Sequence, residues 1–304
     1  MIAFQSMSFR YGKRPLFEGL DLDLEPGSIF GLLGLNGAGK TSFLKLAAGA
    51  LRPQGGEISV FGRNPSERSA EGLADIYFVP EDPWLPPITS SAWIERYASF
   101  RPAFDKARFE KLLDELALED DKVLTKYSYG QRKKFALAAA LSSGAHALLL
   151  DEPTNGLDIP SKAQLRRILA ESADPSRVVV VSTHQVRDLE NIIDPVIIVH
   201  GGKVLFRLSS EELGERLFTR HLSSLEGQAI VYAERDALGW SALLAKPSAP
   251  GSVEGEETGP ADLELVFDAA IAAPERLEAA LRGAGDALEA YRPEEHEIAK
   301  EASK

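Results

Sequence analysis

The chain has 304 residues, enough for about two domains, and its 44% apolar and 26% charged composition is that of a globular protein. It contains no cysteine, so disulfides, thiol catalysis and cysteine-ligated metal sites are excluded. A net charge of −12 argues against nonspecific binding of nucleic acid, because that binding depends on Lys and Arg that neutralise phosphates.

Neither a membrane span nor a secretory leader is expected. The most membrane-like stretch, residues 135–150, is shorter than the roughly 20 apolar residues that a spanning helix needs. The first residues show no apolar segment followed by a small-residue cleavage site. We therefore expect a cytoplasmic protein.

The first part of the chain begins with strand-like patterns. Residues 1–25 alternate apolar and polar side chains and end at Pro26-Gly27, which predicts short strands around a turn. A buried strand over 28–33, a glycine-rich loop over 34–39 and a helix over 40–50 follow. Residues 76–80 read as another strand, and residues 88–145 repeat apolar side chains at helical spacing, which predicts a helical insert.

Strand patterns return after this insert. We expect strands at 147–150, 177–181 and 196–199 that alternate with helices near 161–171 and 186–193. Such alternation predicts a mostly parallel sheet. A turn at Gly201-Gly202 leads into a further extended segment at 203–206.

The character of the sequence changes after about residue 210. Residues 201–304 hold 11 basic and 20 acidic residues, so this part carries −9 of the net charge of −12. Residues 246–261 are rich in Pro, Gly, Ser and Glu, which is typical of a mobile loop. Strands at 228–232 and 263–267 and a helix at 274–281 surround this loop, and together they predict a small C-terminal α/β appendage.

The glycine-rich loop carries the first chemical motif. Gly34-Leu-Asn-Gly-Ala-Gly-Lys40-Thr41 has a glycine, four residues and then Gly-Lys-Thr, which is the phosphate-loop pattern. In this motif backbone amides surround the phosphates of a nucleotide, Lys40 reaches the β- and γ-phosphates, and Thr41 binds Mg²⁺. The alternative is a plain strand-to-helix turn. The candidate nucleotide-binding residues of this segment are Gly34, Asn36, Gly37, Ala38, Gly39, Lys40, Thr41 and Ser42.

Two carboxylates end a later apolar strand, in Ala147-Leu-Leu-Leu-Asp151-Glu152-Pro153. Beside a phosphate loop, Asp151 would hold Mg²⁺ through water, and Glu152 would orient and deprotonate the attacking water. The motif alone would also fit a capped strand. The phosphate loop earlier in the chain favours the catalytic interpretation.

A third motif, Tyr127-Ser-Tyr-Gly-Gln131, lies just before this strand, where one large family of ATPases has Leu-Ser-Gly-Gly-Gln. With these motifs in this order, residues 1–210 resemble the nucleotide-binding subunit of ABC transporters. The resemblance implies an α/β fold: a P-loop NTPase core with a mainly parallel sheet, an N-terminal antiparallel β subdomain and a helical subdomain at about 85–145. Residues 211–304 would form a C-terminal accessory region with its mobile loop at about 246–261.

The resemblance also implies that Ser128, Gly130 and Gln131 contact ATP bound to a second subunit, so that two chains enclose two ATP molecules. Ser128 and Gly130 precede a predicted helix, whose N-terminus suits a phosphate. Ser128 also fits a simple helix N-cap. Tyr127 and Tyr129 depart from the leucine and the first glycine of the family pattern.

Further family positions match residue by residue. Asn155-Gly-Leu-Asp158 corresponds to the loop that links the two sites, His184 to the histidine that senses the γ-phosphate, and Tyr11 to the aromatic that stacks on adenine. The candidate catalytic residues are thus Glu152, His184 and Lys40. As alternatives, Tyr11 could pack into the core, and His184 could be an ordinary loop residue.

Glu81 stands where the family usually has a glutamine that touches Mg²⁺ and the attacking water. A carboxylate binds Mg²⁺ at least as well, although it adds negative charge beside a triphosphate. The resemblance therefore implies Thr41, Asp151 and Glu81 as metal ligands. The alternative for Glu81 is a surface turn position away from the metal.

The segment after Glu81 leads into the helical insert, which in this family docks on membrane subunits. Trp84, Trp93 and Tyr97 could line that docking groove, although aromatics at helical spacing more often belong to a core. The basic run over residues 132–134 predicts a solvated helix face or support for the motif helix, with contact to lipid headgroups as an alternative.

The resemblance implies an ATPase that powers transport, with ATP and Mg²⁺ as ligands. Its partners would be a second copy of the chain and transmembrane permease subunits, which would hold it at the inner face of the cell membrane. The motifs are similar to those of bacterial drug, peptide and antibiotic exporters, so export is expected and an importer ATPase is the alternative. A soluble ABC protein of translation or DNA repair is disfavoured, because the sequence has one phosphate loop, no heptads and no basic face.

Overall fold

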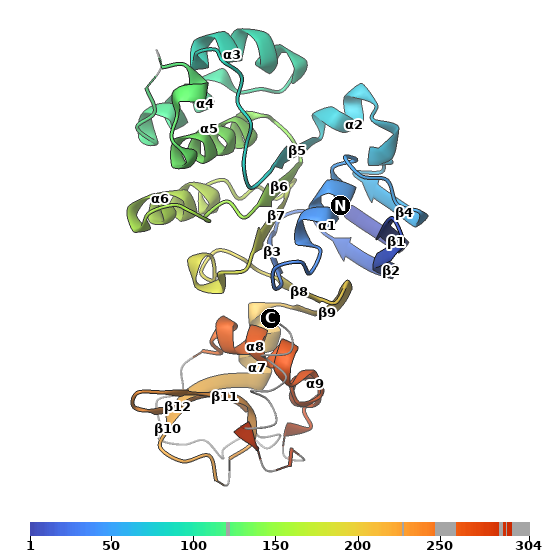
Figure 1. The fold of residues 1–304 in the computed structure, drawn as a ribbon, viewed down its shortest axis with the longest axis vertical. Helices are drawn as coiled ribbons and strands as arrows, with labels where there is room; N and C mark the ends of the chain where they lie inside the picture. Colours follow the sequence, from blue (N-terminus) through green and yellow to red (C-terminus); the bar gives the residue numbers. More distant parts are fainter. Residues whose placement is uncertain (120–121, 227, 247–259, 286–287, 290, 294–304) are drawn as a thin grey trace. The chain divides into compact units, whose positions relative to one another are not determined.

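The chain divides into two compact units in the computed structural model (Figure 1). The model describes residues 1–119, 122–226, 228–246, 260–285, 288–289 and 291–293. The first unit comprises Met1–Ile193 and Gly201–Lys203, and the second comprises Asp194–His200 and Val204–Lys304. The two units are defined by which residues contact one another. The domain boundary predicted at residue 210 stays a prediction. Among the helices of the described residues, none has the length and apolar character needed to cross a bilayer.

An antiparallel sheet opens the first unit. It contains β1 (Ile2–Tyr11), β2 (Arg14–Leu24) and β4 (Gly55–Val60) in the order β2-β1-β4. The alternation predicted over residues 1–25 is confirmed, because every second side chain toward the end of β2 is buried. Strand β4 was not predicted; it is short and begins with two glycines, so its alternation is weak.

A parallel set of strands forms the centre of the same unit. β5 (Ile76–Val79), β6 (Ala147–Asp151), β7 (Val178–Thr183) and β3 (Ile29–Leu33) are neighbours in that order, and each adjacent pair is parallel. Every residue of β3, β6 and β7 is buried, as expected of a sheet covered on both faces. The mostly parallel sheet is confirmed, and the carboxyl ends of its strands lie at one edge.

Helix α1 (Lys40–Ala47) contacts β4, β6 and β7, so it lies between the two sheets. The predicted helical insert is confirmed as α3 (Ser90–Tyr97), α4 (Lys106–Glu115) and α5 (Tyr129–Ser142). Its core is aromatic: the Trp93 ring lies 5.6 Å from that of Phe109 and 5.4 Å from that of Phe135. Trp93 is therefore a core residue.

The remaining helical elements of the first unit are short, apart from α6 (Ile159–Ala170). They are α2 (Ala70–Ala74), η1 (Pro65–Glu67), η2 (Ala98–Phe100), η3 (Leu124–Lys126) and η4 (Val186–Asp188). The prediction of a helix over residues 186–193 was wrong, because only the single 3₁₀ turn η4 forms there. Leu189 leaves the helical region with φ −133° and ψ −3°, and Pro195 disfavours helix in the residue before it.

The second unit holds β8 (Val196–His200), most of β9 (Lys203–Leu208) and a further antiparallel sheet. That sheet has the order β10-β12-β11, from β10 (Leu217–Leu222), β12 (Gly239–Ala245) and β11 (Ile230–Asp236). Its helices are α7 (Ser210–Arg216), α8 (Leu263–Ala272) and α9 (Pro274–Leu281), of which α9 was predicted.

The strand predicted at 263–267 was wrong, because this segment begins α8. The side chain of Asp262 accepts hydrogen bonds from the amides of Glu264 and Leu265, at 2.8 and 3.3 Å, and so caps a helix. A short apolar run has the same pattern in a buried strand and in a buried helix. The mobile loop predicted at 246–261 falls largely on residues 247–259, which lie outside the described residues.

Candidate active site

The loop between β3 and α1 has the backbone of a phosphate loop. Gly37 and Gly39 adopt φ of +82° and +107°, which side chains rarely allow. A Cβ atom on Gly39 would also lie 2.9 Å from Cζ of Phe17. Gly39 provides no capping side chain for α1, so the first amides of this helix point to the loop and favour an anion there.

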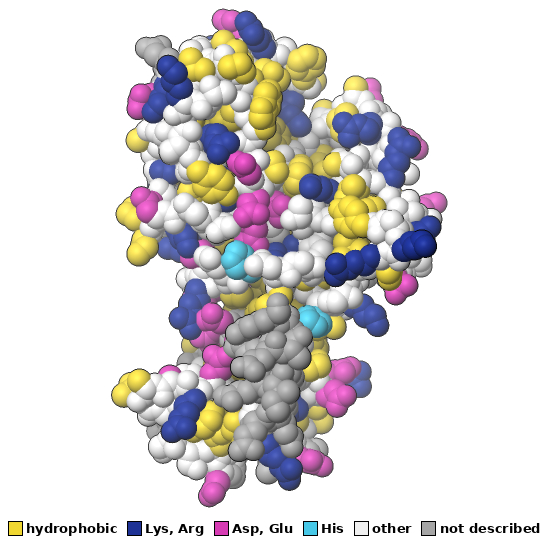
Figure 2. Space-filling view, in the orientation of Figure 1, with side chains coloured by type: hydrophobic (Ala, Val, Ile, Leu, Met, Phe, Trp, Pro, Cys, Tyr) yellow, Lys and Arg dark blue, Asp and Glu magenta, His cyan; other side chains and the backbone are white. Residues whose placement is uncertain are grey.

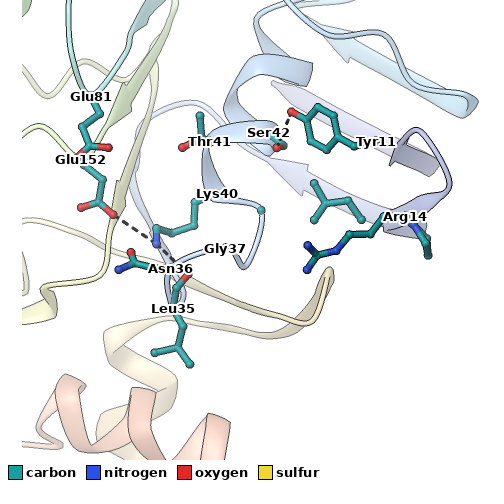
Figure 3. A pocket seen from close by; sticks show the side chains of 13 residues that line it. Tyr11, Arg14, Leu35, Asn36, Gly37, Lys40, Thr41, Ser42, Glu81 and Glu152 are labelled. Atoms are coloured by element: carbon teal, nitrogen blue, oxygen red, sulfur yellow. Dashed lines mark hydrogen bonds and ion pairs between the residues drawn. The ribbon is translucent and has the colours of Figure 1, made fainter. Parts of the chain in front are cut away.

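This loop lines a cavity of about 470 Å³ (Figure 3). Figure 3 shows Glu81 and Glu152 on one side, Tyr11 and Arg14 on the opposite side, and Lys40 between them. The lining therefore has an aromatic end and an end with carboxylates and an ammonium. The lining residues are Tyr11, Arg14, Pro15, Leu16, Leu35, Asn36, Gly37, Gly39, Lys40, Thr41, Ser42, Glu81 and Glu152.

Lys40 is 6% exposed at the inner end of the cavity. Its Nζ atom donates a 2.6 Å hydrogen bond to the carbonyl oxygen of Gly34 and lies 3.4 Å from Oε1 of Glu152. The amide of Ala38 donates to the carbonyl oxygen of Leu35 at 3.1 Å, which closes the loop around this ammonium. A buried cation held mainly by carbonyls provides a site for phosphate oxygens.

Glu152 has an unusual backbone for a residue with a side chain. Its φ is +46°, and its amide donates to Oγ of Ser182 at 3.0 Å. Its Oε1 atom lies 3.0 Å from Nδ1 of His184. A left-handed non-glycine residue is strained, and such strain often occurs at functional sites. The carboxylate thus lies against one ammonium and one imidazole.

The predicted metal ligands are all oxygen donors. Thr41 and Glu81 line the cavity, and Asp151 is the last, buried residue of β6, where its Oδ1 atom accepts from Oγ of Ser182 at 2.7 Å. Within the described residues, no three His, Cys, Asp or Glu side chains cluster closely enough to hold a metal alone. This donor set fits Mg²⁺, which prefers oxygen and is usually held by one or two carboxylates together with substrate phosphates.

Glu81 is tied to the loop that follows β6. Its Oε1 atom accepts a 2.7 Å hydrogen bond from the side-chain amide of Asn155. It also lines the cavity, on the same side as Glu152. Figure 2 shows Asp and Glu side chains gathered in the middle of the first unit's visible face, with Lys and Arg side chains scattered around them.

Tyr11 lies at the aromatic end and is 51% exposed. Its hydroxyl oxygen lies 3.1 Å from Oγ of Ser42, and its ring makes an edge contact with Phe9 at 4.9 Å. The half-exposed ring is therefore not a core aromatic, and its orientation is fixed from two sides. Such a ring can stack on a planar base.

Ser128, Gly130 and Gln131 of the third motif are not among the residues that line the cavity. Ser128 forms a capping box at the start of α5: its Oγ atom accepts from the Gln131 amide at 3.2 Å, and its own amide donates to Oε1 of Gln131 at 3.0 Å. The N-cap interpretation of Ser128 is thus correct. A Cβ atom on Gly130 would lie 3.3 Å from a methyl carbon of Leu157. The structure does not bring these residues to the cavity of their own chain.

Tyr127 and Tyr129, which depart from the family motif, both donate hydrogen bonds within their own chain. The hydroxyl of Tyr127 donates to the carbonyl oxygen of Glu119 at 2.8 Å, and that of Tyr129 donates to the carbonyl oxygen of Glu81 at 3.1 Å. Burial, more than the nearby carboxylates, raises the pKa of Tyr129. Its ring also covers Gly156, where a Cβ atom would lie 2.8 Å from Cε1 of the ring.

Sequence reasoning missed several residues of this site. Arg14, Leu16 and Leu35 line the cavity, and Ser182 contacts both acidic residues at the end of β6. Ser182 directly follows the strand predicted at 177–181, and its pairing with Asp151 across β6 and β7 brings it to the carboxylates. Arg14 and Leu16 line the cavity because of how β1 and β2 pack near the loop. No local sequence pattern indicates that packing.

The basic run over residues 132–134 was predicted as a solvated helix face or as support for the motif helix, and for Lys133 the solvated face was wrong. Its side chain is 3% exposed, and its Nζ atom donates to the carbonyl oxygens of Glu152 at 2.6 Å and Asn155 at 2.8 Å. Burial, opposed by nearby carboxylates, lowers its pKa to about 8. The basic run contains no signal that separates Lys133 from Lys134.

The chain is similar to proteins of known family. The family model described as ABC transporter matches residues 17–155. The bacitracin transport ATP-binding protein BcrA of Bacillus licheniformis is 30% identical over 210 residues, which cover 68% of this chain and 69% of BcrA. The SkfA peptide export ATP-binding protein SkfE of Bacillus subtilis (strain 168) is 32% identical over 211 residues, which cover 67% of this chain and 87% of SkfE.

A solved structure agrees in fold. The dimeric bacterial ABC transporter cassette MJ0796 has a TM-score of 0.60 at 21% identity, and the match covers 69% of this chain and 98% of that one. The matched fold has the P-loop core with its mostly parallel sheet.

Proposed function

The chain belongs to the ABC transporter family as an ATP-binding ATPase, and on this premise we propose that two copies enclose ATP and that its hydrolysis drives export through separate transmembrane subunits. The observation that carries the proposal is the position of the Glu152 carboxylate, 3.4 Å from the Lys40 ammonium and 3.0 Å from the His184 ring. This is the end of the cavity where the γ-phosphate would lie.

The cavity suits ATP from end to end. Adenine would stack on the exposed ring of Tyr11, and the phosphates would extend along the loop toward Lys40. The α1 amides and the Lys40 ammonium would neutralise the phosphate charge, and a phosphate oxygen is a stronger partner for this ammonium than the Gly34 carbonyl that now accepts from it.

Thr41, Asp151 and Glu81 would hold Mg²⁺ together with the phosphates. When bound, Mg²⁺ neutralises the charge that develops on the β- and γ-phosphates. The Ser182 hydroxyl keeps the Asp151 carboxylate in place, and the Asn155 amide does the same for Glu81.

The chemical step is attack of water on the γ-phosphorus. Glu152 orients this water and accepts its proton, the bond from the γ-phosphorus to the β,γ-bridging oxygen breaks, and ADP and inorganic phosphate result. His184 lies against the Glu152 carboxylate, and its ring would contact the γ-phosphate. The fixed, strained backbone of Glu152 supports this assignment, because positioning provides much of the rate in phosphoryl transfer.

We assign Ser128, Gly130 and Gln131 to the ATP held by the second copy. They lie at the N-terminus of a helix of 14 residues and do not line the cavity of their own chain, which fits a role in a partner's site. One chain carries both Glu152 and His184, so two identical copies would form two complete sites. The solved MJ0796 cassette is a dimer, which supports this arrangement.

Export is proposed from the names of the relatives, which describe bacitracin transport and peptide export. The permease would dock beside α3, where Trp84 is 76% exposed just before the helix. The chain would thus attach to the inner face of the membrane. We further propose residues 1–210 as the ATPase domain, with its helical subdomain at about 85–145, and residues 211–304 as an accessory region.

The test is the Glu152→Gln variant of the full chain. We expect ATP turnover to fall by about 100-fold or more, because the general base is lost. The variant should still bind ATP and, with Mg²⁺, should elute as a dimer in size-exclusion chromatography with light scattering. Glu110→Gln, on an exposed face of α4, should behave as the wild type. Turnover within twofold of the wild type, or a variant that is only monomeric with ATP and Mg²⁺, would contradict the proposal.

A further inference from the structure

The side chain of Lys133 leaves α5 and enters the turn that follows β6. Its ammonium is 3% exposed and donates to two backbone carbonyl oxygens, those of Glu152 at 2.6 Å and Asn155 at 2.8 Å. Lysine is seldom fully buried, because removing its charge from water is costly. Because burying this ammonium costs free energy, its position beside a candidate active site suggests a functional role for Lys133.

The first of these carbonyls belongs to the residue with the strained backbone. Glu152 is held at φ +46° from both sides, because Ser182 Oγ accepts from its amide and Lys133 donates to its carbonyl. The direction of a side chain depends on the φ and ψ of its own residue. These two hydrogen bonds therefore hold the backbone from which the Glu152 carboxylate extends.

The second carbonyl belongs to the residue that holds Glu81. Asn155 donates its side-chain amide to the Glu81 carboxylate, and its backbone is held by the same lysine. Tyr129, one helical turn before Lys133, adds a further link: its ring centroid lies 4.9 Å from Nζ, and its hydroxyl donates to the Glu81 carbonyl. One ammonium thus contacts Glu152 itself and the two residues, Asn155 and Tyr129, that hydrogen-bond to Glu81.

We propose that Lys133 is a positioning residue for ATP hydrolysis, which acts through the backbone of Glu152 and Asn155. Lys133 is not among the described residues that line the cavity, so this role needs no contact with the nucleotide. The inference rests on the role proposed above for Glu152. It adds a residue outside the family motifs to the machinery that orients the base.

The experiment compares Lys133→Met with Lys134→Met in the full chain. Methionine keeps most of the length of the lysine side chain and removes its donors, and Lys134 is the matched neighbour in the same basic run. We expect Lys133→Met to lower kcat by about 10- to 100-fold, the size of effect that misplacing a catalytic group has. KM and the Kd for ATP should stay within twofold of the wild type, as should every parameter of Lys134→Met.

A second variant keeps the test sharp if methionine disturbs folding. Lys133→Gln retains a donor for one of the two carbonyls, so its kcat should lie between those of the wild type and Lys133→Met. Wild-type kcat in both variants would overturn the proposal. An equal loss of kcat and of ATP affinity would overturn it too, because a purely structural defect affects both.

Double-mutant analysis separates this inference from the function on which it rests. If Lys133 acts through Glu152, then Glu152→Gln with Lys133→Met should have the residual single-turnover rate of Glu152→Gln alone. Additive losses would overturn the inference. If Glu152→Gln is active, the proposed function is overturned. If Glu152→Gln is inactive and Lys133→Met is fully active, only the role of Lys133 is overturned.

Discussion

The side-chain amide of Asn155 donates a 2.7 Å hydrogen bond to the carboxylate of Glu81, and so joins the loop after β6 to the segment after β5. The two residues are 74 positions apart in the chain. An amide donor can bond to a carboxylate or to an amide oxygen, although more strongly to the charged group. Replacing Glu81 by glutamine should therefore keep this contact in a weaker form and remove the charge.

The first prediction concerns Mg²⁺. Glu81→Gln should raise the Mg²⁺ concentration for half-maximal ATPase activity by about threefold or more, because a neutral amide is a weaker ligand for a hard cation than a carboxylate. Activity measured against Mg²⁺ at fixed ATP checks this. Asp82→Asn is the control: Asp82 is an exposed neighbour paired with Arg132. An unchanged Mg²⁺ dependence in Glu81→Gln would remove Glu81 from the metal ligands.

The second prediction concerns the aromatic end of the cavity. Tyr11→Ala should weaken ATP binding by about tenfold, because stacking on a base contributes about 1–3 kcal/mol. Tyr11→Phe keeps the ring and loses only the contact with Ser42, so its affinity should stay within about twofold. Calorimetric titration with ATP measures both. Tyr97→Ala removes a ring that is 40% exposed and does not line the cavity, so this variant should bind ATP as the wild type does. An effect equal to that of Tyr11→Ala would refute stacking.

The third prediction follows from the lowered pKa of Lys133. Between about pH 8 and pH 10.5 the unfolded chain keeps the proton on this lysine, whereas the folded chain has released it. The contribution of Lys133 to the free energy of unfolding therefore rises with pH through this window and is constant below it. Denaturation without nucleotide or Mg²⁺ should show a steeper rise for the wild type and Lys134→Met than for Lys133→Met. Equal slopes in all three would refute the shift.

The fourth prediction separates the two tryptophans near α3. Trp93 is 9% exposed and lies in an aromatic core, so Trp93→Ala should lower the free energy of unfolding by about 3–5 kcal/mol. Trp84 is 76% exposed, and Trp84→Ala should change it by less than about 0.5 kcal/mol. Urea denaturation measures both. Comparable losses in the two variants would show that Trp84 belongs to the core and would leave the docking role without support.

Much of the candidate site could be predicted from the sequence, because its motifs are local. The strand, loop and helix around Lys40 are contiguous in the sequence. Their spacing alone therefore predicts a loop in which glycine amides and the Lys40 ammonium face one phosphate-binding site. The pair at Asp151 and Glu152 could be assigned to the same site, because parallel strands bring their carboxyl ends to one edge of a sheet. These inferences need only the order of elements along the chain.

Prediction from local sequence failed where one pattern of apolar residues is compatible with two kinds of secondary structure. The apolar run that begins at Leu263 is compatible with a buried strand and with a buried helix, and packing together with the Asp262 cap decided for the helix. The segment after Val186 had helical spacing, yet only one 3₁₀ turn forms, since the backbone of Leu189 leaves the helical region. In both cases the alternatives differ in long-range contacts that short windows of sequence do not contain.

The sequence by itself thus determined the family, the phosphate loop and the acidic pair, since each depends on residue types at fixed spacing. Only the tertiary structure decided that Lys133 is buried while its neighbour Lys134 is not, and that Asn155 reaches Glu81. The physical reason is that burial and pairing depend on which elements pack together. A lysine in a basic run has the same local sequence whether its ammonium meets water or the carbonyl of a strained glutamate.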